Sequence, residues 1–347
     1  MFIGHKLRGS ATLFAAALIA VTPFLVAHAV AEEVNIYSYR KEHLIKPQLD
    51  AFTKLTGIRV NLVTGKADAL IQRILREGMN SPADILLSAD AGRLVRSKNM
   101  GILQAVKSAK LDAAIPARYR DPAGFWFGLG IRVRAIFYAP DRVKPSDLSS
   151  YEALTGSQWK NRVLIRSSSN IYNQSLLASL IDHHGKQGAT DWARGIVANM
   201  ARRPQGGDTD QIRGVAAGAG DVAIANHYYF ARLLASKKQR DKDVVAKVRI
   251  FWPNQNGRGA HVNISGGGVT KASKNKAAAI RLLEYLAGPE AQKIYAEKGH
   301  EFPVRKGVAV SAVVASMGNF KSDNIAIKVL GANNAEAVRI FDRVGWR

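Results

Sequence analysis

The segment FWFGLGIRVRAIFYAP, residues 125–140, is long, apolar and rich in residues that favour β-strands. A strand of this length can pass from one domain into another. The chain has 347 residues, which at roughly 150 residues per domain is enough for two domains. We therefore expect this segment to be a strand that crosses between two domains.

Strand and helix patterns alternate before the crossing segment. Strands are expected at 33–39, 58–65 and 81–90, and helices at 43–57, 66–80 and 91–101. The stripe Leu49, Phe52 and Leu55 has helical spacing, as does the stripe Ala67, Leu70, Ile71, Ile74 and Leu75. This order predicts a parallel sheet covered by helices, with a ligand at the carboxyl ends of its strands.

A second α/β series follows the crossing segment. A helix and a strand are expected within 148–169, helices at 173–185 and 190–203, strands at 221–226, 248–255 and 262–271, a helix pair at 275–299 and a largely helical tail beyond 310. Two α/β lobes joined by crossing strands predict a hinge and a cleft that closes around a ligand.

The N-terminus has the pattern of a secretory signal peptide. Lys6 and Arg8 precede an apolar run that ends in small residues near 27–31. We expect residues 1–31 to be removed on export, which places the mature protein in the periplasm. The chain has no cysteine, so thiolate metal sites and cysteine nucleophiles are excluded and any metal must be held by oxygen or imidazole.

The charge balance is strongly basic. The formal net charge is +23, and removing Lys6 and Arg8 leaves +21. A basic chain often binds nucleic acid, but export and the scattered positions of Lys and Arg argue against that partner. Attraction to an anionic ligand or to a membrane surface fits better.

Tyrosines stand at three strand–helix junctions. Tyr39 ends the first strand, Tyr172 lies in SSSNIYNQSL, and Tyr228 and Tyr229 follow the strand DVAIAN. Adjacent residues of one strand point to opposite faces, so the pair can meet one ligand only where the chain turns into the helix expected at FARLL.

Several phenols at one point suit a hard, highly charged cation. A phenol has a pKa of about 10, and a metal ion can displace its proton. Ca²⁺ and Mg²⁺ prefer carboxylates and carbonyls, and Zn²⁺ prefers His or Cys. Fe³⁺ is the cation whose binding best offsets the cost of deprotonating several tyrosines. The residues alone do not decide whether Fe³⁺ or Fe²⁺ is the ion bound in the cell.

The chain resembles the periplasmic ferric-iron-binding proteins of ABC importers over nearly all of the mature sequence. The resemblance rests on the blocks IYSYR, LIKPQLDAFTKLTGI, NSPADILLSADAGRL, RSSSNIYNQSLLASL, PQGGDTDQI, ANHYYFARLL and FWPNQNGRGAHVNISGGGV. It implies an α/β, two-lobed periplasmic binding protein fold of type II, with a first lobe at 32–133 plus 265–305 and a second at 134–264 plus 306–347. It also implies a monomer that binds Fe³⁺, delivers it to a membrane permease and performs no catalysis.

The resemblance also implies a ligand set. Three tyrosines of the second lobe in that family match Tyr172, Tyr228 and Tyr229. Many members have a His–Tyr pair where Lys41 and Glu42 stand here, so Tyr39 is the expected fourth ligand, with Glu42 and His43 as weaker candidates.

The family often adds a synergistic anion such as carbonate, or water. Arg40, Arg132 and Arg134 are candidates to hold it, because Arg132 and Arg134 share one face of the crossing strand. His227, beside the tyrosine pair, is expected to orient a ligand rather than to be one.

Two alternatives stay open. The same fold could hold phosphate, phosphonate or another organic anion through hydroxyls, helix N-termini and Arg, although phenols suit a bare anion poorly. An exported enzyme is the other alternative. The chain has no G-x-S-x-G, H-E-x-x-H or P-loop motif, the His pair in DHHG at 182–185 is expected at the surface, and no pairing can be assigned to Asp84, Asp90, Asp208 or Asp210.

Overall fold

The chain folds around a mixed β-sheet, and a single long strand runs from one half of this sheet to the other. The structure is a computed structural model that describes residues 1–5 and 32–347, and Glu32–Arg347 forms one compact unit. The predicted signal peptide lies almost wholly in residues outside the described ones. No helix of the described residues has the length and apolar character needed to cross a membrane.

The strands follow the predicted order. They are β1 (Glu33–Ser38), β2 (Arg59–Thr64), β3 (Ile85–Ala89), β4 (Phe127–Tyr138), β5 (Val163–Leu164), β6 (Val222–Asn226), β7 (Arg249–Phe251) and β8 (Val262–Val269). The sheet order is β2-β1-β3-β8-β4-β6-β5, with β7 beside β4. The parallel pairing predicted for the first three strands is confirmed, and β8 pairs in antiparallel fashion with β3 on one side and with β4 on the other.

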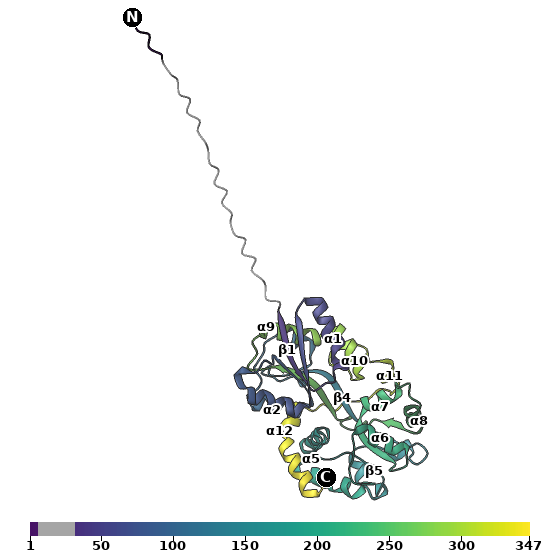
Figure 1. Ribbon diagram of the computed structural model, residues 1–347. Coiled ribbons are helices and arrows are strands. Elements are labelled where there is room, and N and C mark those ends of the chain that lie inside the picture. Colours follow the sequence, from purple (N-terminus) through teal and green to yellow (C-terminus); the bar gives the residue numbers. More distant parts are fainter. Residues whose placement is uncertain (6–31) are drawn as a thin grey trace. The chain divides into compact units, whose positions relative to one another are not determined.

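Strand β4 changes partners along its length. Residues from Phe127 to Val133 pair with β8, and residues from Arg134 to Tyr138 pair with β6. In Figure 1, β4 runs from the part of the sheet that holds β1 toward α6 and β5. The predicted crossing strand is therefore present, and its partner changes between Val133 and Arg134.

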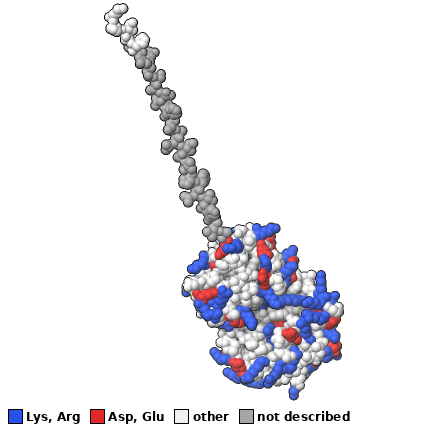
Figure 2. All heavy atoms as spheres, in the orientation of Figure 1, with Lys and Arg blue, Asp and Glu red and all other residues white. Residues whose placement is uncertain are grey.

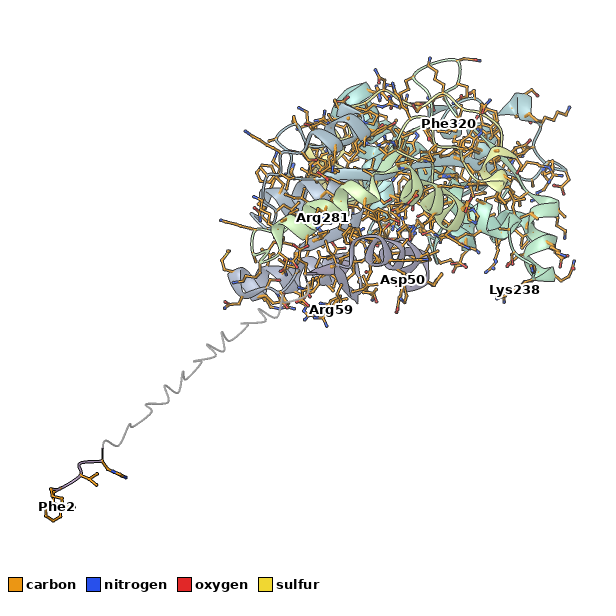
Figure 3. All side chains as sticks on the ribbon, turned by 90° about the horizontal axis from the view of Figure 1, so that it is seen from above. Phe2, Asp50, Arg59, Lys238, Arg281 and Phe320 are labelled. Carbon is orange, nitrogen blue, oxygen red and sulfur yellow. The ribbon has the colours of Figure 1, made fainter. Side chains whose placement is uncertain are left out.

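The helices cover this sheet. They are α1 (Glu42–Thr56), α2 (Ala67–Glu77), α3 (Ala91–Asn99), α4 (Ala109–Ala114), α5 (Ile171–Asn199), α6 (Asp208–Ala216), α7 (His227–Leu234), α8 (Gln239–Lys247), α9 (Lys276–Leu286), α10 (Pro289–Gly299), α11 (Ala312–Ala315), α12 (Lys328–Ala332) and α13 (Asn334–Val344). Helix α12 packs against both α3 and α5. Helices α1 and α9 also pack together, and Asp50 and Arg281 mark them in Figure 3.

Two local expectations are wrong. Leu55 and Leu75 were expected in the buried stripes of α1 and α2, but both are exposed, because each lies at the edge of its helix's apolar face. The helix expected within 148–169 is replaced by short 3-10 turns at Glu152–Thr155 and Ser157–Trp159. The two helices expected around DHHG are confirmed, because the segment α5 is broken into two helices at Gly185, whose φ of 67° interrupts the helical path.

Candidate metal site

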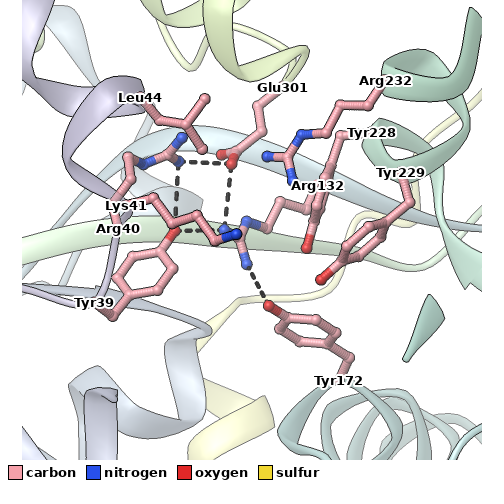
Figure 4. Close-up of a pocket in the computed structure, with 10 residues that line it drawn as sticks. All are labelled: Tyr39, Arg40, Lys41, Leu44, Arg132, Tyr172, Tyr228, Tyr229, Arg232 and Glu301. Atoms are coloured by element: carbon pink, nitrogen blue, oxygen red, sulfur yellow. Dashed lines mark hydrogen bonds and ion pairs between the residues drawn. The ribbon is translucent and has the colours of Figure 1, made fainter. Parts of the chain in front are cut away.

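The four predicted tyrosine ligands line one cavity of about 200 Å³. Its other lining residues are Arg40, Lys41, Leu44, Arg132, Arg232 and Glu301. Figure 4 shows the hydroxyls of Tyr172, Tyr228 and Tyr229 pointing toward one another, with the Arg132 head group between them and Tyr39. The cavity therefore collects side chains from the turn after β1, from α1, β4, α5 and α7, and from the segment after α10.

Two helix N-termini position the three clustered tyrosines. Tyr172 is in the first turn of α5, where the Asn170 side chain caps the helix by accepting from the Tyr172 backbone N–H at 3.1 Å. Tyr228 and Tyr229 are in the first turn of α7. The positive end of each helix dipole favours the negative charge of a phenolate.

The turn from β6 into α7 lets adjacent tyrosines face one cavity. Successive strand residues would diverge, but the helical turn brings the two rings to a centroid distance of 4.4 Å with planes 35° apart. Arg232, one helical turn after Tyr228, lies with its guanidinium 4.9 Å from that ring's centroid. The turn that the sequence predicted at this junction is present.

Arg132 is the central cation of the cavity. Its guanidinium donates to the hydroxyls of Tyr39 and Tyr172, the latter at 3.3 Å, and forms an ion pair with Glu301 at 3.2 Å. Arg40 donates to Tyr39 at 3.4 Å and pairs with Glu301 at 2.6 Å. Both arginines are 4% exposed, so these contacts are shielded from water.

The phenols differ in acidity. Burial raises the pKa of Tyr172, but the Arg132 charge and a hydrogen bond with Tyr228 outweigh it and leave the pKa below its ordinary value. Burial, Tyr172 and Tyr229 raise the pKa of Tyr228, and burial, Tyr172 and Asp208 raise the pKa of Tyr229. Burial also raises the pKa of Tyr39, against the pull of Arg132 and Arg40. A cation that binds all four must therefore displace protons, which makes binding stronger at higher pH.

The remaining predicted residues lie elsewhere. Arg134 pairs with Asp208 at 2.8 Å and donates to Asn173 at 2.6 Å, and it does not line the cavity. Glu42 and His43 are exposed and do not line it either.

His227 is fully buried beneath the tyrosine pair. Its Nδ1 accepts from the Val133 backbone N–H at 3.1 Å and its Nε2 lies 2.9 Å from the His300 carbonyl oxygen. This assigns a neutral imidazole with both nitrogens occupied. Burial lowers its pKa to about 4.

The residues considered for catalysis do not assemble. His183 pairs with Asp323, and His184 lies 2.9 Å from Glu152. Asp84 and Asp90 take up separate hydrogen-bond networks. Within the described ranges no three His, Asp or Glu side chains come together as a metal cluster.

Sequence reasoning missed Glu301, which lies after α10 and is 261 residues from Arg40 in the chain. Its side chain lines the cavity. Nothing in its local sequence marks it as a buried charge. Arg232 had a signal, its helical spacing from Tyr228.

Residues 80–334 match the family described as bacterial extracellular solute-binding protein. Iron uptake protein A1 of Synechocystis is 46% identical over 316 residues, which cover 91% of this chain and 88% of that protein. The Trichodesmium protein IdiA (FutA), solved in complex with iron and citrate ligands, is 52% identical with a TM-score of 0.88, covering 91% of this chain and 100% of that one. A ferric binding protein from Campylobacter jejuni is 41% identical with a TM-score of 0.86, covering 90% and 100%. The α/β, two-lobed type II fold expected from the sequence is confirmed by these neighbours.

Proposed function

The chain belongs to the family of bacterial extracellular solute-binding proteins, and on this premise we propose that its solute is Fe³⁺, which it carries to an ABC importer. The observation that carries the proposal is the meeting of four phenols, from the turn after β1, from α5 and from α7, in one cavity. Phenolate oxygens are hard donors that suit a trivalent ion. The relatives named for iron uptake and ferric binding support the same solute.

The proposed ligands are Tyr39, Tyr172, Tyr228 and Tyr229. Coordination positions left over would go to water or to a small anion such as carbonate, close to Arg40 and Arg132. Protonation of the phenols, reduction of the ion or opening of the lobes would release it.

We further propose that the lobes comprise 32–133 with 265–305 and 134–264 with 306–347. The change of partner along β4 between Val133 and Arg134 supports this division. A monomer in the periplasm would close on iron, dock on the permease and perform no catalysis. Lys and Arg side chains are scattered over the face seen in Figure 2, which fits a soluble carrier rather than a nucleic-acid groove.

Thermal unfolding of the mature protein tests the solute. A ligand that binds only the folded state raises the melting temperature by mass action. Fe³⁺ should raise it strongly, whereas phosphate or a small phosphonate in millimolar excess should leave it unchanged. A rise with the phosphorus-containing anion and none with Fe³⁺ would instead favour the anion carrier.

A further inference from the structure

The Glu301 carboxylate is a buried anion held at the cavity by two arginines. It is 1% exposed and pairs with Arg40 at 2.6 Å and with Arg132 at 3.2 Å. Ser265 donates a hydrogen bond to its second oxygen. A buried carboxylate with this many partners is fixed in place and ionised.

Without a cargo ion, the buried positive and negative charges around the cavity do not cancel. Arg40 and Arg132 supply two positive charges, and Glu301 supplies one negative charge. Lys41 is exposed and Arg232 is half-buried, so water and salt screen these two cations. The buried framework therefore carries one net positive charge.

We propose that Glu301 is the charge-balancing residue of the site, which sets its preference for a trivalent over a divalent ion and replaces an obligatory external anion. The inference rests on the proposed function. Four phenolates around a trivalent ion leave one negative charge, which the single positive charge of the framework cancels. A divalent ion with the same ligands would leave an uncompensated negative charge in a buried site, which is costly.

The position of Glu301 explains why the arginines do not repel the cargo. Without its carboxylate, two adjacent guanidiniums would face the incoming ion. The Glu301 carboxylate forms an ion pair with the guanidinium of Arg40 and with that of Arg132. Arg132 still donates hydrogen bonds to Tyr39 and Tyr172. The two arginines thus stabilise the ionised form of the tyrosines, and Glu301 reduces the net charge of the three buried residues to one positive charge.

The test compares metal selectivity in Glu301→Gln, which keeps the shape and removes the charge. Affinities for Fe³⁺ and Zn²⁺ are measured in carbonate-free buffer, with acetohydroxamate as the competitor for Fe³⁺. The ratio of Fe³⁺ to Zn²⁺ affinity should fall by at least about tenfold, because one unit charge near the ion changes. Added bicarbonate should restore Fe³⁺ binding to the variant and change that of the parent protein by less than about threefold.

Two further variants separate charge from structure. Glu301→Asp retains the charge and should keep a ratio close to that of the parent. Asp84→Asn removes a buried carboxylate that contacts Asn35, Ser273 and Asn275 rather than the cavity, and should leave the ratio unchanged.

An unchanged ratio of Fe³⁺ to Zn²⁺ affinity in Glu301→Gln, including an equal loss of affinity for both metals, overturns the inference. Iron binding then remains the proposed function. Failure of the parent protein to bind Fe³⁺ overturns the proposed function itself.

Discussion

The Arg132 guanidinium donates to the Tyr172 hydroxyl across 3.3 Å, linking the long strand β4 to the first turn of α5. The two residues are 40 positions apart in the chain. This contact places a fixed positive charge beside a phenol that must ionise to hold a metal, and it accounts for the lowered pKa of Tyr172 against the effect of burial.

Replacing Arg132 by Met should move iron binding to higher pH. The Arg132 charge lowers the pKa of Tyr172, so its loss raises that pKa and makes the phenol harder to deprotonate. We expect the pH midpoint of Fe³⁺ binding to rise by about one unit, a change worth roughly 1.4 kcal/mol. Titration of the Fe³⁺–phenolate absorption from pH 5 to 9 measures the midpoint, and an unchanged value would separate Arg132 from the acidity of the site.

The variant Tyr229→Phe should keep the fold and weaken Fe³⁺ binding by at least about tenfold, since one anionic ligand is lost. Tyr285→Phe is the matched control. The Tyr285 hydroxyl is buried without a hydrogen-bond partner, so its removal should leave both stability and iron affinity unchanged or slightly improved. Competition titration gives both affinities, and equal values for the two variants would remove Tyr229 from the ligand set.

The stability of the metal-free protein should fall between pH 6.5 and about 3. Burial lowers the pKa of His227 to about 4 and that of His261 to about 3, whereas both histidines titrate near 6.5 when unfolded. The unfolded state therefore binds more protons as the pH falls, and stability present above pH 6.5 is lost toward the folded pKa values.

Urea unfolding at several pH values measures this loss. Each histidine contributes a slope of at most about 1.4 kcal/mol per pH unit. His261→Phe removes one titrating imidazole and should therefore remove one such share of the slope. The change breaks no hydrogen bond at Nδ1, which has no partner. A slope that is the same in this variant would show that other groups govern the acid response.

Ser175→Ala should destabilise the protein by about 1–3 kcal/mol, because it takes a partner from a buried carboxylate. The Ser175 hydroxyl donates to Asp90 at 2.7 Å and thereby fastens α5 to the end of β3. Ser179→Ala, one turn along the same helix, is the control, since that buried hydroxyl has no partner. Urea unfolding should show a loss in the first variant alone, and a similar effect in both would argue against the Asp90 contact as its cause.

The sequence predicts this fold well where local patterns decide it. Runs of apolar and β-forming residues located β1 to β4, and the strand–helix junctions pointed to Tyr39, Tyr172, Tyr228 and Tyr229, which all line the cavity. Such predictions work because a parallel α/β sheet places its junctions along one edge.

Features set by tertiary contacts could not be predicted. Arg132 and Arg134 share a strand face, yet β4 changes partners between them, so Arg134 meets Asp208 while Arg132 enters the cavity. Glu301 reaches Arg40 only through the packing of the segment after α10. Neither outcome has a local signal in the chain.

The visible spectrum of the purified mature protein during Fe³⁺ addition tests the central claim most directly. We expect a band in the region of roughly 400–500 nm from charge transfer between phenolate and Fe³⁺, saturating at one ion per chain, as deprotonated tyrosine ligands require. The band should be lost in a variant with Phe at 172, 228 and 229. Tight Fe³⁺ binding without this band, or a band that persists in the triple variant, would contradict a tyrosinate iron site.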